Sequence, residues 1–263
     1  MALRFPDSKQ APDADVVGEL GAGLSERPDR TRYRELLTTL TRSARTAGRG
    51  AVISGQWLAE TVIDTAPRVP IRDVETLSRH HEGLTGEALA RSMIRSSGRV
   101  SASIGAAAGG LVAVQELSVA AALAIPFELA AETALVVLVE LKLVAELHQV
   151  AGRPLPGGPR EQVAGAVRSW LSGRAVSGSS LVSSGKVDLL GRTTRLRMAA
   201  ALRGRMTRNL TTLAPLLAGS AIAGWLNRRF TIDVGRRVAD DLGLVGDTIW
   251  RARRPRRRGW ATL

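Results

Sequence analysis

The sequence predicts an all-α protein, a helical bundle built around a long apolar helical hairpin. Residues 100–150 form its longest stretch poor in polar side chains. Aromatic residues make up 3% of the chain, so the core must consist of Leu, Val and Ala, a composition that favours helices over sheets. Apolar residues also recur at helical spacing on both sides of this stretch. The pattern leaves open whether the hairpin inserts into a membrane.

The first 29 residues predict a disordered leader, because they combine Pro6, Pro12 and Pro28 with several Asp and Gly residues. They lack the apolar segment and cleavage site of a signal peptide. We therefore expect the chain to stay on the cytoplasmic side of the cell membrane.

Residues 31–65 have helical apolar spacing, and Pro67 ends the pattern. Three glycines weaken the middle of this helix by about 1 kcal/mol each relative to alanine, so a break is expected there. A short helix follows over residues 71–81. Another is expected to begin after Thr85, as its cap, and to continue into the apolar block.

The apolar block contains Pro126, which lacks the N–H that a helix interior needs. We therefore expect one helix to end near Leu123 and a second to run from Pro126 to Gly152. The first half has no charge from Val100 to Gln115. A bilayer span needs about 20 mostly apolar residues, so residues 100–127 would be long enough only if Glu116 were tolerated.

The second helix of the block carries four charges that fall within about 80° of each other on a helical wheel. They are Glu128, Glu132, Lys142 and Glu146. One interpretation is an amphipathic helix with one wet face. The other is a buried polar stripe, in which Lys142 pairs with Glu146 or Glu128 between packed helices, because charges in apolar surroundings need partners.

The remaining chain is basic, with a second uncharged run at residues 210–226 that contains Pro215. We divide the chain into a leader (1–29), a helical domain (30–250) and a polybasic tail (251–263). Within the domain we expect the apolar hairpin (100–151), a basic linker (152–208) and a glycine-rich helix (209–227). Close helix packing is expected at Gly105, Gly109, Gly219 and Gly224.

The net charge of +13, from 37 basic and 24 acidic residues, favours contact with an anionic surface, either lipid or nucleic acid. The candidate contact residues are arginines of the basic linker and the tail: Arg192, Arg195, Arg203, Arg254, Arg256, Arg257 and Arg258. Trp250 and Trp260 flank the tail, as aromatic residues do at membrane interfaces. Nucleic-acid modules usually combine such charge with stacking aromatic residues, which are scarce here.

No catalytic constellation is recognisable. Residues 178–187 resemble a phosphate-binding loop but have six residues between the glycines where four are needed. Residues 80–85 lack the second histidine of a zinc-protease helix. The chain has no cysteine. We expect no enzymatic activity, no metal and no cofactor.

One stretch resembles a known family. Pro215, the glycine-rich run through Gly224, Asn227, Thr231, Gly235 and Ala239 follow one another at helical spacing. This pattern is similar to the C-terminal signature of the EcsC family, and the glycine-rich segment at 105–110 is also similar. The resemblance covers roughly residues 85–240. It implies a bacterial helical protein associated with membranes, transport or secretion, with no defined reaction. In this signature we expect Asn227 to end or cap a helix and Thr231 to begin the next.

Two functions follow as hypotheses. The first is a membrane-associated helical accessory or scaffold protein, possessing a lipid or protein partner. The alternative is a soluble arginine-rich helical protein that binds nucleic acid. The sequence does not determine the oligomeric state.

Overall fold

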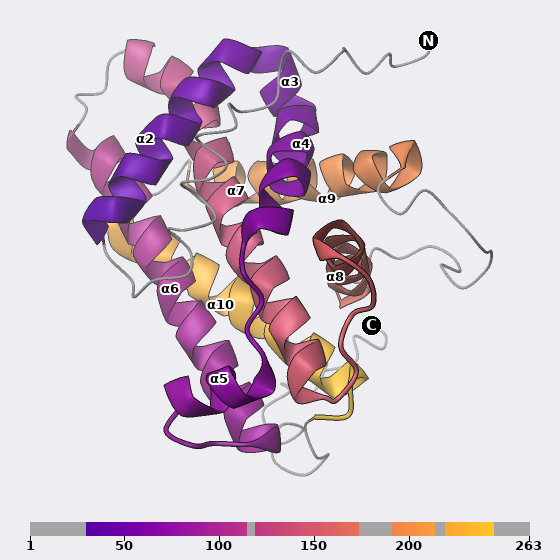
Figure 1. The fold of residues 1–263 in the computed structure, drawn as a ribbon. Coiled ribbons are helices and arrows are strands. Elements are labelled where there is room, and N and C mark those ends of the chain that lie inside the picture. The colour runs from indigo at the N-terminus through magenta and orange to yellow at the C-terminus, as the bar shows by residue number, and fades with distance from the viewer. Residues whose placement is uncertain (1–29, 115–118, 174–190, 214–218, 245–263) are drawn as a thin grey trace, which may run out of the picture.

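The computed structural model describes residues 30–114, 119–173, 191–213 and 219–244 (Figure 1). These residues form helices joined by short connections and contain no strand, so the all-α prediction is confirmed. In chain order the elements are α2 (Arg30–Ala47), α3 (Arg49–Ile53), α4 (Gln56–Thr65), the 3₁₀ turn η1 (Ala66–Arg68), α5 (Val74–His80), α6 (Gly86–Val114), α7 (Val119–Val150), α8 (Pro159–Gly173), α9 (Arg192–Leu213) and α10 (Gly219–Asp241).

Helix α7 is the centre of the bundle. It contacts α2, α3, α4, α6, α8, α9 and α10, and every residue from Leu129 to Leu141 is buried. An all-round apolar helix is stable in water only when neighbours cover it on every side. The polar faces of the surrounding helices therefore form much of the outer surface.

The predicted break at Pro126 is wrong. Helix α7 runs without interruption from Val119 to Val150 with Pro126 inside it. The proline ring removes one hydrogen bond, the bond that an N–H at this position would donate to the carbonyl of residue 122. Packing of the apolar residues further along α7 outweighs the loss of this single bond.

Helices α6 and α10 lie antiparallel and in close contact (Figure 1). Small residues face each other where the two helices cross. A Cβ atom placed on Gly105 of α6 would lie 2.8 Å from the backbone of Ala223, and one on Gly224 of α10 would lie 2.8 Å from the carbonyl oxygen of Ala102. Real Cβ atoms do not approach so closely. Glycine is therefore required on both sides of this crossing.

The N-terminal helices α2, α3 and α4 cover another side of α7. The expected break in the 31–65 segment occurs at Gly48 and Gly55, which adopt φ angles of 89° and 76°. A Cβ on Gly55 would collide with the carbonyl oxygen of Ala199 in α9, so the glycine at this turn also permits α4 and α9 to pack.

Among the residues that the structure describes, none of the helices combines the length and the apolarity that crossing a membrane requires.

Candidate functional site

The most polar part of the core surrounds Glu140 of α7, whose side chain is completely buried. Trp170 of α8 donates a hydrogen bond from Nε1 to Glu140 Oε2 over 2.8 Å. Arg205 of α9 donates from Nη1 to both carboxylate oxygens, over 2.9 and 3.0 Å. Thr231 of α10 places its hydroxyl 3.2 Å from Glu140 Oε1. One carboxylate thus joins α7 to three other helices.

The network continues into α6 through Thr231. Its hydroxyl oxygen lies 2.8 Å from the hydroxyl oxygen of Ser101, and both residues are fully buried. Each hydroxyl has one proton, so both bonds form when Ser101 donates to Thr231 and Thr231 donates to Glu140. Buried polar groups need such partners, since an unmade bond costs about 1–3 kcal/mol.

Arg205 is the cation of this network and is 2% exposed. Its guanidinium carbon lies 5.8 Å from the centre of the Phe230 ring, within the range of a cation–π interaction. Nη1 is used by Glu140, whereas Nε and Nη2 have no hydrogen-bond partner among the described residues. The ion pair, the ring and the burial together fix α9 against the core.

A second buried carboxylate, Glu132, lies two turns before Glu140 on α7. Asn227 of α10 donates a hydrogen bond from Nδ2 to Glu132 Oε1. Burial raises the pKa of Glu132 to about 7, against the opposing effects of the Asn227 hydrogen bond and the charge of Arg205. Glu132 therefore exchanges its proton near neutral pH.

A third buried carboxylate, Glu146, is held by two cations near the other end of α7. Arg72 donates from Nε over 2.7 Å and from Nη2 over 2.9 Å, and Lys142 Nζ lies 2.8 Å away. Lys142 also donates to the carbonyl oxygen of Pro70. Burial raises the pKa of Glu146, but the Arg72 hydrogen bonds and the charge of Lys142 outweigh it and leave this pKa lowered.

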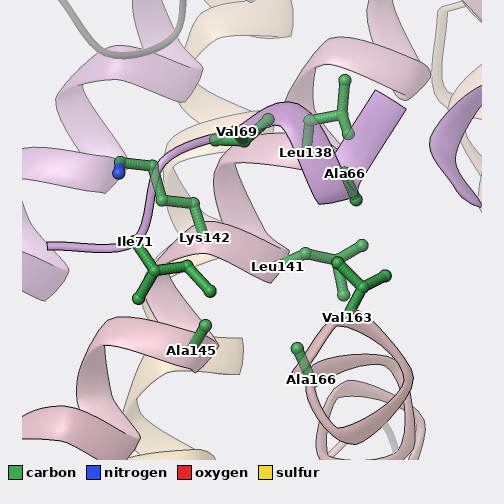
Figure 2. A pocket seen from close by; sticks show the side chains of 9 residues that line it. All are labelled: Ala66, Val69, Ile71, Leu138, Leu141, Lys142, Ala145, Val163 and Ala166. Carbon is green, nitrogen blue, oxygen red and sulfur yellow. The ribbon is translucent and has the colours of Figure 1, made fainter. Parts of the chain in front are cut away.

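This ion cluster fastens the chain between η1 and α5 to α7. Arg72 Nη1 also lies 3.2 Å from Nδ1 of His80. A small apolar pocket lies beside the cluster, between this segment, α7 and α8 (Figure 2). The cavity volume is about 10 Å³, enough for about one water molecule. Apart from Lys142, the side chains that line the pocket are apolar. The pocket is therefore too small for a substrate.

The structure places the four residues of the predicted stripe in different surroundings. Glu132 and Glu146 are buried, whereas Glu128 and Lys142 are partly exposed. Lys142 pairs with Glu146, one of the two partners expected for it. The predicted stripe therefore contains two separate sites. Glu132 is hydrogen-bonded to the neutral Asn227, and Glu146 forms ion pairs with Arg72 and Lys142.

Of the predicted packing glycines, Gly105 and Gly224 lie at the α6–α10 crossing, while the packing around Gly109 and Gly219 lies outside the described part of the chain. The predicted roles of Asn227 and Thr231 at helix ends are wrong. Both lie inside α10, which continues from Gly219 to Asp241. Their spacing of four residues puts both on the buried face, where they bind Glu132 and Glu140 instead of the backbone.

The predicted arginine contacts lie on α9 where the structure describes them. Arg192 and Arg203 are exposed and Arg195 is partly exposed. Helix α9 contains no acidic residue, and its exposed residues include Arg192, Arg197 and Arg203, so its outer face carries positive charge. The tail arginines, Arg254, Arg256, Arg257 and Arg258, lie outside the described residues.

The outer face of α10 carries an exposed aromatic residue beside basic ones. Trp225 is 53% exposed, and the guanidinium carbon of Arg229 lies 5.5 Å from the centre of its ring. Arg228 is exposed beside it. Leu123, near the start of α7, is 52% exposed. A large exposed indole covered by an arginine is typical of an interaction surface.

Sequence reasoning missed Glu140, Arg205 and Trp170, which form the centre of the buried network. Glu140 carries a signal, because it interrupts the apolar run 134–141 and a lone charge there needs a partner. Nothing in the sequence distinguishes Arg205 from the neighbouring arginines of α9.

The described residues contain no group of three or more side chains suited to hold a metal ion. Comparison with known proteins gives no significant match to a family model, a curated protein or a solved structure.

Proposed function

We propose that the chain is a helical accessory or scaffold protein, without enzymatic activity, that docks on the anionic cytoplasmic face of the cell membrane. The observation that carries this proposal is the exposed Trp225 with Arg229 against its ring and Arg228 beside it. Indole rings prefer the boundary between headgroups and acyl chains. Arginines next to them bind lipid phosphates, each contributing about 1 kcal/mol.

The basic outer face of α9 supports the same function. Arg192 and Arg203 are exposed on it, and the helix carries no acidic residue. Attraction to an anionic leaflet reaches about one Debye length, so these arginines would strengthen docking without specific contacts. The resemblance of residues 215–239 to the EcsC signature, which no family model supports, implies the same association with membranes.

In this proposal α7 stays inside the bundle while the protein is bound. Insertion of the hairpin would remove Glu140 from Trp170 and Arg205. A lone carboxylate at the centre of a bilayer costs at least about 2.5 kcal/mol. Peripheral docking leaves the network intact, and it needs no helix that spans the membrane.

Fractionation of the tagged full-length protein in a bacterial host tests the proposal. We expect the protein to sediment with membranes at low salt and after nuclease treatment, and to be released by a high-salt wash, because salt screens the exposed arginines. Recovery in the soluble fraction at low salt would contradict it. Release by nuclease alone would favour the alternative function, binding of nucleic acid through the same arginines.

A further inference from the structure

We propose that Glu132 and Asn227 form a proton-responsive joint that ties α7 to α10 when Glu132 is neutral and loosens when it is charged. This inference is independent of the docking function. It concerns a contact inside the bundle, on the opposite side of α10 from the exposed Trp225.

The joint consists of one ionisable and one neutral side chain, both deeply buried. Glu132 is 7% exposed and Asn227 is 2% exposed, and Asn227 Nδ2 donates to Glu132 Oε1. An amide is a hydrogen-bond donor without a charge, so it cannot neutralise a carboxylate. A buried carboxylate without a cation is strongly disfavoured and takes up a proton instead.

Among the residues that the structure describes, the side chain in contact with the Glu132 carboxylate is the neutral Asn227, and no cation forms an ion pair with it. A Cβ atom on Gly105 of α6 would lie 2.7 Å from Asn227 Nδ2, so backbone closes this side. The buried side chains of α2 are those of Tyr33, Leu36, Leu37, Leu40 and Ala44, none of which is a cation. On α7 itself the nearest ionisable groups are Glu128, one turn before, and Glu140, which Arg205 already binds.

Arg205 is the cation of α9 whose charge reaches Glu132, and burial still outweighs its effect on the pKa of Glu132. Glu146 provides the contrast on the same helix. It is equally buried, but Arg72 and Lys142 contact it directly and its pKa is lowered. The difference between the two carboxylates is the charge of their partners.

The consequence is a packing contact that depends on pH. Below about pH 7 Glu132 is neutral and accepts the Asn227 bond at little cost. Above this pH it carries a buried charge, which favours conformations that admit water between α7 and α10. Because the folded protein holds this proton more tightly than the unfolded chain, stability falls as pH rises from about 4.5 to about 7.

Urea unfolding of the full chain and of Glu132→Gln between pH 4.5 and 8.5 tests the joint, because glutamine keeps the shape and cannot ionise. We expect the unfolding equilibrium constant of the native chain, divided by that of Glu132→Gln, to rise by up to about tenfold per pH unit between pH 4.5 and 7. It should then stay level. A ratio that is constant over the whole range would overturn the proposal.

A second measurement on the native chain alone covers the case in which Glu132→Gln does not fold. The side-chain carboxyl carbon of Glu132, followed by NMR, should titrate near pH 7. Amides of α10 around Asn227 should exchange with solvent faster above this pH, after correction for intrinsic exchange, while amides around Lys142 should not. Titration of Glu132 near pH 4.5, or uniform exchange along both helices, would overturn the proposal.

Discussion

Arg205 Nη1 lies 2.9 Å from Glu140 Oε1 in the centre of the bundle, and neither side chain has appreciable contact with solvent. Taking two charges out of water costs several kcal/mol per ion, which the pair recovers only through good geometry and further hydrogen bonds. Trp170 and Thr231 supply such bonds to the carboxylate. The pair thus fixes which face of the arginine-rich helix α9 turns inward.

Arg205→Met should lower the free energy of unfolding by about 3–5 kcal/mol, because it leaves the Glu140 charge buried and unpaired. Urea denaturation at pH 7 measures the change. Arg203→Met is the matched control on the same helix, since Arg203 is exposed and its replacement should stay within about 0.5 kcal/mol. Equal effects of the two substitutions would refute the assigned role of Arg205.

Replacing both members of the pair, with Arg205→Met and Glu140→Leu, should be less destabilising than Arg205→Met alone. The double variant removes both charges from the core and keeps apolar volume. A double-mutant cycle in urea measures this coupling. Purely additive losses would show that the two charges do not interact.

Gly105→Ala should lower the free energy of unfolding by about 1–3 kcal/mol, because the new Cβ would overpack the crossing of α6 and α10. It would lie 2.7 Å from Asn227 Nδ2 and 2.8 Å from the Ala223 backbone. Gly204→Ala is the control, since a Cβ there meets nothing within 4 Å. Gly204→Ala should instead stabilise α9 by up to about 1 kcal/mol; thermal melts that ranked the two variants the other way would contradict this packing.

Glu146→Gln should destabilise the protein at neutral pH. The pH dependence of its effect should have the opposite sign to that of Glu132→Gln. The pKa of Glu146 is lowered in the folded state, after burial is outweighed by Arg72 and Lys142. Its ionised form therefore contributes stability above the ordinary glutamate pKa of 4.5, and this contribution is lost as pH falls through the folded-state pKa. Urea midpoints of the two chains should converge towards acid pH; a gap that widened there would show the wrong sign.

The all-α fold could be predicted because the helical spacing of the apolar residues and the low aromatic content both indicate helices. The glycines within residues 31–65 also indicate where that helical segment is interrupted. Gly48 and Gly55 divide the N-terminal segment because both take positive φ angles. The prediction that Pro126 ends a helix was wrong, because it considered only the local effect of proline on the backbone and not the tertiary packing of α7. The burial of α7 holds the helix together across a residue that would end an isolated one.

The buried network could be predicted only in part, since partners depend on which helices become neighbours. Glu132 and Glu146 could be identified as charges on an apolar helix, but their partners Asn227 and Arg72 are 95 and 74 residues away in the chain. The sequence predicts that Asn227 ends or caps a helix, because asparagine is favoured at helix caps. Its place inside α10 follows from the carboxylate it meets on α7.

The docking surface makes a prediction for isolated vesicles. Trp225→Ala should weaken binding to phosphatidylglycerol-containing vesicles, because it removes the exposed ring that can enter the headgroup layer. Ile53→Ala removes an apolar side chain that is 48% exposed on α3, and it should change binding less. Vesicle co-sedimentation at fixed salt measures both; equal losses would mean that apolar exposure in general, and not the α10 site, supports binding.

The most direct test of the docking surface reverses its charge. Arg228→Glu with Arg229→Glu should reduce co-sedimentation with vesicles of phosphatidylcholine and phosphatidylglycerol by about tenfold or more. The charge contribution is about 1 kcal/mol for each arginine, and the new glutamates add repulsion. Arg68→Glu with Arg79→Glu changes the same charge at exposed positions in η1 and α5 and should have a smaller effect. We expect clearly weaker binding by the Arg228→Glu, Arg229→Glu variant than by the Arg68→Glu, Arg79→Glu variant. Equal binding by both would contradict docking through α10.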